Sequence, residues 1–132
     1  MIVFVDTSAW YAVLASRDPN HATARAIFRR LASARDHLVT HNYVVVETLA
    51  LVGRRLGMEA VRTFSLDLQG VSDVEWVMPA VHDRALAGYL DSSRELSFVD
   101  HVSFAVMRTR GIRTAFAFDR DFEAHGFALL RA

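Results

Sequence analysis

The sequence predicts an α/β fold, with a central parallel sheet of about five strands flanked by helices. Short runs of β-branched and aromatic residues recur along the chain, and between them apolar residues return every three or four positions. Strands that alternate with helices in this way are typical of parallel sheets built from right-handed crossovers. At 132 residues, 52% of them hydrophobic, the chain is expected to form one domain spanning 1–132.

Five runs are expected to be strands. The first, Ile-Val-Phe-Val, contains no polar residue, as a strand buried on both faces requires. The other four are similarly rich in strand-forming residues, and each lies between segments with helical spacing. In order, the predicted strands are Ile2–Val5, His37–Thr40, Val74–Met78, Thr114–Phe118 and Phe127–Leu130.

Helices are expected between these strands. One begins after Asp6, where apolar residues resume, and the segment from Ser97 starts Ser-Phe-Val-Asp, which is similar to a capping box. Pro79 suits a first helical turn, and Gly57 and Gly111 suit helix ends. The remaining predicted helices are His21–Arg35, Asn42–Leu56, Met58–Leu68, Pro79–Leu90, Ser97–Arg110 and the short Arg120–His125.

The composition excludes several kinds of chemistry. The chain has no cysteine, which excludes disulfides and thiolate metal sites, and no lysine, which excludes Schiff-base catalysis and a P-loop. Its 15 arginines balance 15 acidic residues, so any binding of nucleic acid must depend on local charge. No apolar stretch approaches the roughly 20 residues of a membrane helix, and the N-terminus does not resemble a signal peptide. We therefore expect a cytoplasmic protein that does not contact membranes.

Four acidic residues stand in apolar surroundings. Asp6 and Asp119 each end a predicted strand, and Glu47 and Asp100 lie in strongly apolar helices. Each has an ordinary explanation: Asp6 and Asp119 can cap helices, Asp100 can face a helix dipole, and Glu47 can pair with Arg54 or another arginine at the helix surface. Capping at separate places explains poorly why all four would meet at the carboxyl edge of a parallel sheet, where such folds place their sites.

Carboxylates gathered in one pocket require a positive partner. Because the chain has no lysine and offers oxygen ligands, Mg²⁺ or Mn²⁺ is the natural partner. An ion held in this way can activate water and stabilise phosphoryl oxygens. The acidic residues therefore predict metal-assisted hydrolysis of a phosphodiester.

Four stretches together resemble a known family. They are VDTSAWYAVL, NYVVVETLALV with the following RRLG, LSFVDHVSFAVM and AFDRDF. In this order and spacing they are similar to the PIN-domain ribonucleases, and specifically to VapC-type toxins of toxin–antitoxin modules. The resemblance covers nearly the whole chain. It implies an Mg²⁺- or Mn²⁺-dependent endoribonuclease that forms a homodimer and is neutralised by a VapB-like antitoxin.

The resemblance also implies roles for particular residues. The catalytic acids fall on Asp6, Glu47, Asp100 and Asp119, and the metal ligands on Asp6, Asp100, Asp119 and the auxiliary Asp121. Thr7 and Ser8 match the hydroxyls that orient the first acid, and Asn42 matches a supporting polar residue. His101 departs from the pattern, because a small residue usually follows this aspartate. It is either a histidine that supports the site from outside or one that contacts RNA or metal.

Two other functions stay open from the sequence. One is a PIN domain without catalytic activity that binds RNA or an antitoxin; metal binding and RNA cleavage distinguish it from the nuclease. The other is a phosphohydrolase of the haloacid-dehalogenase type. That family places a second aspartate two residues after the first, where this chain has Ser8, and it uses a lysine, which this chain lacks.

Overall fold

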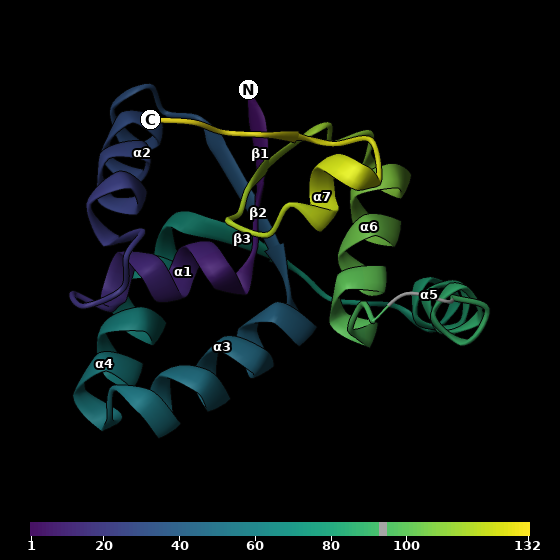
Figure 1. Ribbon diagram of the computed structural model, residues 1–132, viewed down its shortest axis with the longest axis horizontal. Coiled ribbons are helices and arrows are strands. Elements are labelled where there is room, and N and C mark those ends of the chain that lie inside the picture. The colour runs from purple at the N-terminus through teal and green to yellow at the C-terminus, as the bar shows by residue number, and fades with distance from the viewer. Residues whose placement is uncertain (93–94) are drawn as a thin grey trace.

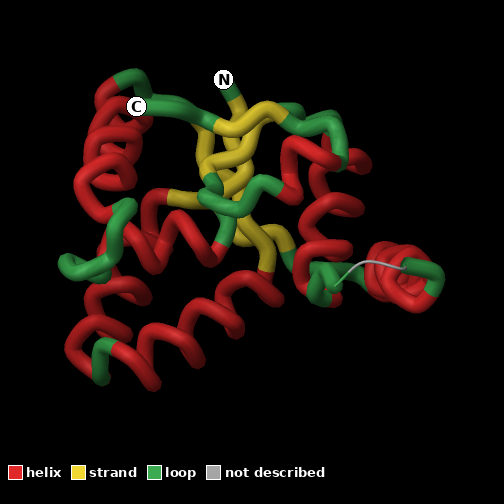
Figure 2. Tube along the Cα trace, in the orientation of Figure 1, coloured by secondary structure: helices red, strands yellow, loops and turns green. Residues whose placement is uncertain are grey.

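The computed structural model describes residues 1–92 and 95–132, and these form an α/β domain around a parallel sheet (Figures 1 and 2). The strand order is β3-β2-β1-β4-β5, with all four pairings parallel. The first strand of the chain is thus the centre of the sheet, and Val3, Phe4 and Val5 are buried, as its uninterrupted apolar sequence predicts. The expected fold class and strand number are confirmed.

The strands are short, and β1 lies between two partners. Val3 of β1 pairs with Leu38 on one side and with Thr114 on the other. Val3, Phe4 and Val5 are completely buried because helices cover both faces of the sheet. The strand bounds are β1 Ile2–Val5, β2 His37–His41, β3 Ser72–Glu75, β4 Thr114–Phe116 and β5 Ala128–Leu129.

The helices form two layers. Figure 1 shows α1, α2 and α4 on one side of the sheet and α5 and α6 on the other, with α3 extending from the end of β2. The bounds are α1 Thr7–Leu14, α2 His21–Ser33, α3 Asn42–Arg55, α4 Met58–Thr63, α5 Pro79–Leu90, α6 Phe98–Arg110 and α7 Asp121–Ala124. Each predicted helix is therefore present, with ends that move by a few residues.

Three predicted strands end earlier than the sequence indicated; the fifth, Ala128–Leu129 in place of Phe127–Leu130, is shorter by one residue at each end, and the third and fourth differ more. The third covers Ser72–Glu75 rather than Val74–Met78, because the N–H of Val77 is bound by the side chain of Asn42 instead of a neighbouring strand. The fourth ends at Phe116 rather than Phe118, whose N–H donates to the hydroxyl of Ser8. In both places a polar side chain takes the backbone group that a longer strand would have used.

Two helical segments also differ from the prediction. The helix expected over His21–Arg35 ends at Ser33, and Arg35 has a positive φ of 55° that no helix continues through. The segment Met58–Leu68 remains helical but widens after Thr63 into a π-helical turn, Phe64–Leu68, followed by a 3₁₀ turn, Gln69–Val71. Phe64 in this turn is completely buried against Trp10, so packing accompanies the wider turn.

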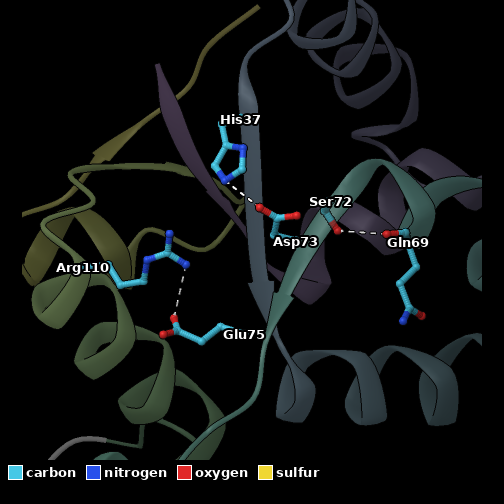
Figure 3. Close-up of polar contacts among 6 residues, drawn as sticks. All are labelled: His37, Gln69, Ser72, Asp73, Glu75 and Arg110. Atoms are coloured by element: carbon cyan, nitrogen blue, oxygen red, sulfur yellow. Dashed lines mark hydrogen bonds and ion pairs between the residues drawn. The ribbon is translucent and has the colours of Figure 1, made fainter.

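Polar contacts attach the edge strand β3 to its neighbours (Figure 3). His37 Nε2 of β2 lies 2.8 Å from Asp73 Oδ2, and Arg110 Nη1 at the end of α6 lies 3.7 Å from Glu75 Oε2. The Ser72 hydroxyl donates to the carbonyl oxygen of Gln69 at 3.3 Å. We refer to His37, Asp73, Glu75 and Arg110 together as the β3 edge.

Within the described residues, no helix combines the length and the apolar character needed to cross a membrane.

Candidate active site

The predicted acidic residues come together where the parallel strands end. Asp6 follows β1, and Asp119 lies three residues beyond the end of β4. Glu47 lies in α3, which follows β2 directly, Asp100 lies in the first turn of α6, and Asp121 is the first residue of α7. The carboxyl ends of parallel strands share one edge, so the topology brings these residues to the same region.

Asp6 is both a helix cap and a buried carboxylate. Its side chain is only 5% exposed, and its Oδ2 accepts hydrogen bonds from the N–H of Ser8 at 3.1 Å and the hydroxyl of Ser8 at 2.7 Å. Asp6 is the N-cap of α1. The capping explanation and the site explanation are therefore both compatible with its position, and the same contacts hold the carboxylate in place.

The hydroxyl of Ser8 also connects two strand ends. It accepts a hydrogen bond from the N–H of Phe118 at 3.0 Å while it donates to Asp6. Phe118 immediately precedes Asp119, whose Oδ1 accepts the N–H of Asp121 at 2.9 Å. Ser8 thus fixes the ends of β1 and β4 relative to each other, together with the carboxylate that follows each.

Asp100 is held by the predicted capping box. Its N–H donates to the hydroxyl of Ser97 at 3.1 Å, and its Oδ2 accepts the N–H of Ser97 at 3.2 Å. This reciprocal pair of hydrogen bonds fixes the carboxylate at the start of α6.

The carboxylates hold protons more tightly than usual. The pKa of Asp6 is raised from 3.8 to about 7. Burial is the main cause, and the negative charges of Asp100 and Glu47 act in the same direction, while the hydrogen bonds from Ser8 oppose the rise. Burial also raises the pKa of Asp100, and the charges of Asp119 and Asp121 act in the same direction. The pKa of Asp119 is raised by burial and by its neighbour Asp121. These interactions connect all five acids electrostatically.

No basic group in the described part of the chain compensates this charge at close range. The ion pairs within 4.0 Å there involve Asp36, Asp73, Glu75 and Glu123, none of which belongs to the cluster. The pairing of Glu47 with Arg54, which the sequence left open, is thus not among them. One buried and four partly buried carboxylates, three of them with raised pKa values, offer oxygen ligands alone, which fit a hard divalent cation.

The described side chains do not form a closed ligand cage. Across residues 1–92 and 95–132, no group of three or more histidine, aspartate or glutamate side chains is arranged to hold one metal ion. Mg²⁺ usually keeps several waters and takes only one or two carboxylates directly. An ion bound among these residues would therefore contact at most two of the described carboxylates directly and keep water as its other ligands.

Two other predicted residues have structural contacts. The hydroxyl of Thr7 is buried and accepts a hydrogen bond from Thr48 at 3.1 Å, which joins α1 to the turn of α3 that carries Glu47. Asn42 Oδ1 accepts the N–H of Val77 at 2.6 Å, which fixes the chain between β3 and α5. Thr48 itself was missed, although a hydroxyl next to Glu47 in an apolar run was a visible signal.

A buried histidine that sequence reasoning also missed links α3 to α6. His41 Nδ1 accepts the N–H of Val44 at 3.2 Å, so Nε2 donates to the hydroxyl of Ser103 at 2.9 Å. Ser103 in turn donates to the carbonyl oxygen of Val99 at 3.0 Å, one residue before Asp100. Burial lowers the pKa of His41 to about 3, so the ring is neutral. The signal was weak, since a lone histidine at a strand end has many explanations.

The side chain of His101 packs among aromatic rings and makes no contact with the acidic residues among the described interactions. Its ring packs with the rings of Tyr89 of α5, Phe104 of α6 and His125 beside α7. It also lines a cavity between α5 and α6.

The class of protein follows from this fold and from a family comparison. The model of the PIN domain matches residues 3–128, and the chain therefore belongs to the PIN-domain family. Known proteins narrow the resemblance. The chain is 41% identical to the 23S rRNA-specific endonuclease VapC20 of Mycobacterium tuberculosis over 98% of both chains. The likeness to VapC-type toxins that the four motifs indicate is confirmed.

Solved structures agree with this assignment. The crystal structure of Mycobacterium tuberculosis VapC20, described as a sarcin-ricin loop cleaving toxin, matches with a TM-score of 0.87 and 40% identity over 100% of both chains. A crystal structure of VapBC2 from Rickettsia felis bound to a promoter DNA fragment matches with a TM-score of 0.74 and 9% identity over 98% of both chains. At this low identity, the second comparison supports the fold alone.

Proposed function

We propose that this chain is a VapC-type toxin that cleaves RNA with the help of Mg²⁺ or Mn²⁺. The observation that carries the proposal is the acidic cluster at the end of the sheet, in which burial and neighbouring carboxylates raise the pKa of Asp6, Asp100 and Asp119. None of its members has an ion-pair partner among the described residues. Such a cluster is electrostatically unfavourable by itself, and a divalent cation compensates it.

The reaction is hydrolysis of a phosphodiester. A bound divalent ion lowers the pKa of water and offsets negative charge on the phosphate. Asp6, Asp100 and Asp119 are the residues we expect to hold it, directly or through water, with Asp121 as an auxiliary acid. Glu47 accepts a proton as the water oxygen attacks phosphorus, the bond from phosphorus to the leaving oxygen breaks, and that oxygen takes up a proton. Thr7 and Ser8 orient the acids, and Asn42 supports them by fixing the chain after β3.

Ribosomal RNA is the substrate we propose to test first. The relative that is 41% identical over nearly the whole chain is an endonuclease specific for 23S rRNA. Proteins of this type act where bases are unpaired and exposed, which in rRNA means loops. Such a substrate implies action in the cytoplasm, as the sequence predicts.

A VapB-like antitoxin is the partner we propose. The chain resembles VapC-type toxins over its full length, and a protein of the same fold is known from a VapBC complex. We also propose that the chain forms a homodimer. Large apolar side chains are exposed after β3 and on α5, among them Trp76, Met78 and Leu90, at 70%, 60% and 74% exposure. Sedimentation of the purified chain tests the dimer.

The first experiment is cleavage of purified 23S rRNA by the partner-free protein in Mg²⁺, in Mn²⁺ and in EDTA. Glu47→Gln and Asp100→Asn are the test variants, and Asp67→Asn, an exposed acid on the π-helical turn, is the matched control. Loss of a general base typically reduces rate by about 10²–10⁴-fold. We expect this loss for Glu47→Gln, no cleavage in EDTA, and wild-type cleavage for Asp67→Asn.

Each outcome has a distinct meaning. Cleavage that persists in EDTA or in Asp100→Asn would contradict the metal site. Absence of cleavage together with absence of Mn²⁺ binding would favour a PIN domain that only binds RNA or its antitoxin. Cleavage that a VapB-like protein from the same source does not inhibit would contradict the proposed partner.

A further inference from the structure

A cavity lies between helices α5 and α6, which pack against each other through Ala85, Val102 and Ala105, and it is apart from the acidic cluster. Its volume is about 300 Å³, and its polar lining consists of Arg84, His101, Arg108 and Thr109. The rest of its wall is formed by small residues, including Gly88. None of the residues that line it is acidic, so the cavity is cationic while the neighbouring end of the sheet is anionic.

The two arginines contact only neutral groups in the described part of the chain. Arg84 Nη1 donates to the hydroxyl of Thr109 at 3.3 Å, and Arg108 Nη2 donates to the carbonyl oxygen of His125 at 3.2 Å. The guanidinium of Arg108 also lies 5.9 Å from the ring centre of Phe104 and 5.3 Å from that of Phe127. Among the described ion pairs, neither arginine has a carboxylate within 4.0 Å.

These contacts hold the guanidinium groups in place without neutralising them. A guanidinium carries five N–H donors in a rigid fork, and the contacts above account for one donor of each arginine. Its geometry matches the oxygens of a phosphate or carboxylate. The arginines come from two helices that face each other across the cavity, so an anion between them can contact both.

Besides the two arginines, the cavity lining contains the ring of His101, and one nitrogen of this ring lacks a hydrogen-bond partner. The Nε2 atom of His101 is buried and has no hydrogen bond within the described residues. Buried nitrogens are nearly always hydrogen-bonded, so such an atom often marks the place of a water or ligand. The protein itself therefore does not satisfy all the polar groups around this cavity.

The position of the cavity connects it to the reaction. His101 immediately follows Asp100, and Arg108 lies on the same helix about 12 Å along the axis from Asp100. An RNA strand that brings one phosphate to the acidic cluster must overcome the repulsion of five acids, and a cationic site beside the cluster offsets this.

We propose that the cavity between α5 and α6 binds a phosphate of the RNA substrate, on the strand next to the bond that is cut. The inference rests on the proposed ribonuclease function. Arg84 and Arg108 are the residues that bind this phosphate, and the hydrogen bond to Thr109 positions Arg84. His101 belongs to this binding site, which answers the question its unusual position raised.

The test compares the double variant Arg84→Gln/Arg108→Gln with Arg35→Gln/Arg62→Gln. All four arginines are exposed, and the second pair lies away from the cavity, so both variants lose the same charge. RNA affinity is measured over a range of salt concentrations, and kcat and KM are measured in Mn²⁺. The melting temperature of each variant confirms that it folds.

We expect the cavity variant to bind RNA about tenfold more weakly, as the loss of charged hydrogen bonds implies. The slope of log K against log salt should fall by about 0.7 for each phosphate contact of single-stranded RNA that is lost. KM should rise while kcat changes little, because the scissile bond is held elsewhere. Arg84→Lys/Arg108→Lys, which keeps the charge, should recover part of the salt slope.

Other results would overturn the proposal. Equal affinity and equal slope in the two double variants would mean that the cavity does not contact RNA. Unchanged RNA binding with lost binding of a VapB-like protein would assign the cavity to a carboxylate of that partner. An NMR titration with inorganic phosphate that shifts the Thr109 and Gly88 amides, without any effect of the variant on RNA, would assign it to a free anion.

The proposed function can fail separately. If wild-type protein neither cuts nor binds RNA, the ribonuclease assignment fails before the variants are compared. If it cuts RNA and the cavity variant behaves as the control does, only the phosphate site is wrong.

Discussion

The β3 edge and the carboxyl end of the sheet use acidic residues in opposite ways. At the β3 edge, Asp73 lies 2.8 Å from His37 and Glu75 lies 3.7 Å from Arg110 (Figure 3). At the carboxyl end, Asp6, Asp100 and Asp119 have raised pKa values, and no ion pair of the described residues includes them. The first arrangement connects strands and helices, and the second concentrates charge that the fold alone does not compensate.

This difference shows which acids the fold needs. The pKa of Asp6 is about 7 in the folded protein, compared with an ordinary value of 3.8. At high pH, where Asp6 is ionised, this difference destabilises the folded state by about 4 kcal/mol. The exposed pairs of the β3 edge contribute at most about 1 kcal/mol each. A bound cation that offsets their negative charge would explain why the protein keeps carboxylates that destabilise its folded state. This is the reason to propose a metal site.

The largest effect that tests this contrast is expected from Asp6→Asn. The amide keeps the size of the side chain and an acceptor for the Ser8 N–H, but it removes the buried charge. We expect RNA cleavage to fall by about 10³-fold or more, on the scale of a lost electrostatic stabilisation. Without metal at pH 8, the melting temperature should rise, because the unfavourable carboxylate is gone.

Asp73→Asn at the β3 edge is the matched control for Asp6→Asn. It breaks an exposed pair with His37, so we expect unchanged cleavage and a change in unfolding free energy below about 1 kcal/mol. If Asp6→Asn lowered the melting temperature instead of raising it, the loss of activity would follow from loss of the fold. Asp6 would then be a structural residue, and the contrast between the two regions would not hold.

The sequence predicted the general plan of both regions. Asp6, Glu47, Asp100 and Asp119 were recognisable because each interrupts an apolar run, and the parallel topology that brings them together follows from alternating strands and helices. The capping box of Ser97 and Asp100 and the helix end at Gly111 followed from local residue preferences and are confirmed.

Contacts between distant residues could not be predicted. The early ends of β3 and β4 depend on Asn42 and Ser8, which bind the backbone of Val77 and Phe118, 35 and 110 residues away. The cavity at Arg84 and Arg108 depends on how α5 packs against α6, which no local pattern specifies. Arg108 and Arg110 lie two residues apart in the sequence, and only the structure separates their surroundings.

The second prediction uses the two histidines at opposite ends of β2. His41→Asn keeps a side chain that can cap α3 but leaves Ser103 without its buried donor and removes a ring that stacks on Phe4. We expect a loss of about 2–3 kcal/mol at pH 7.5. His37→Asn, which changes an exposed residue of the β3 edge, should cost less than about 1 kcal/mol.

The effect of His41→Asn should depend on pH. The folded protein keeps His41 neutral, with a pKa of about 3, whereas the unfolded chain binds a proton near pH 6.5. The contribution of His41 is therefore fully present above pH 6.5 and decreases as the pH falls towards 3. Denaturant unfolding of the wild type and of His41→Asn should give a difference that narrows in this range. A constant difference would mean that His41 is not buried in its neutral form.

The third prediction concerns Ser8, which joins the two strand ends of the acidic cluster. Ser8→Ala removes the hydroxyl that donates to Asp6 and accepts from Phe118. A residue that orients a metal ligand typically changes metal affinity or activity by about 10–100-fold. We expect a loss of this size in Mn²⁺-dependent cleavage, with Ser65→Ala on the exposed π-helical turn as control. If Ser8→Ala cleaves as the wild type does, Ser8 serves only to end β4.

The smallest effect on stability and RNA binding is expected from Arg110→Gln. Comparison of this variant with Arg108→Gln tests whether the β3 edge and the cavity have separate roles. Arg110 and Arg108 both lie in the last turn of α6, but Arg110 pairs with Glu75 of the β3 edge, whereas Arg108 lines the cavity. Since the Arg110 pair is partly exposed, we expect a cost below about 1 kcal/mol in unfolding free energy. RNA affinity and its salt dependence should stay at wild-type values, whereas Arg108→Gln should reduce both. If the two single variants weakened RNA binding equally, the charge of α6 as a whole would attract the RNA, and the β3 edge would be part of the substrate path.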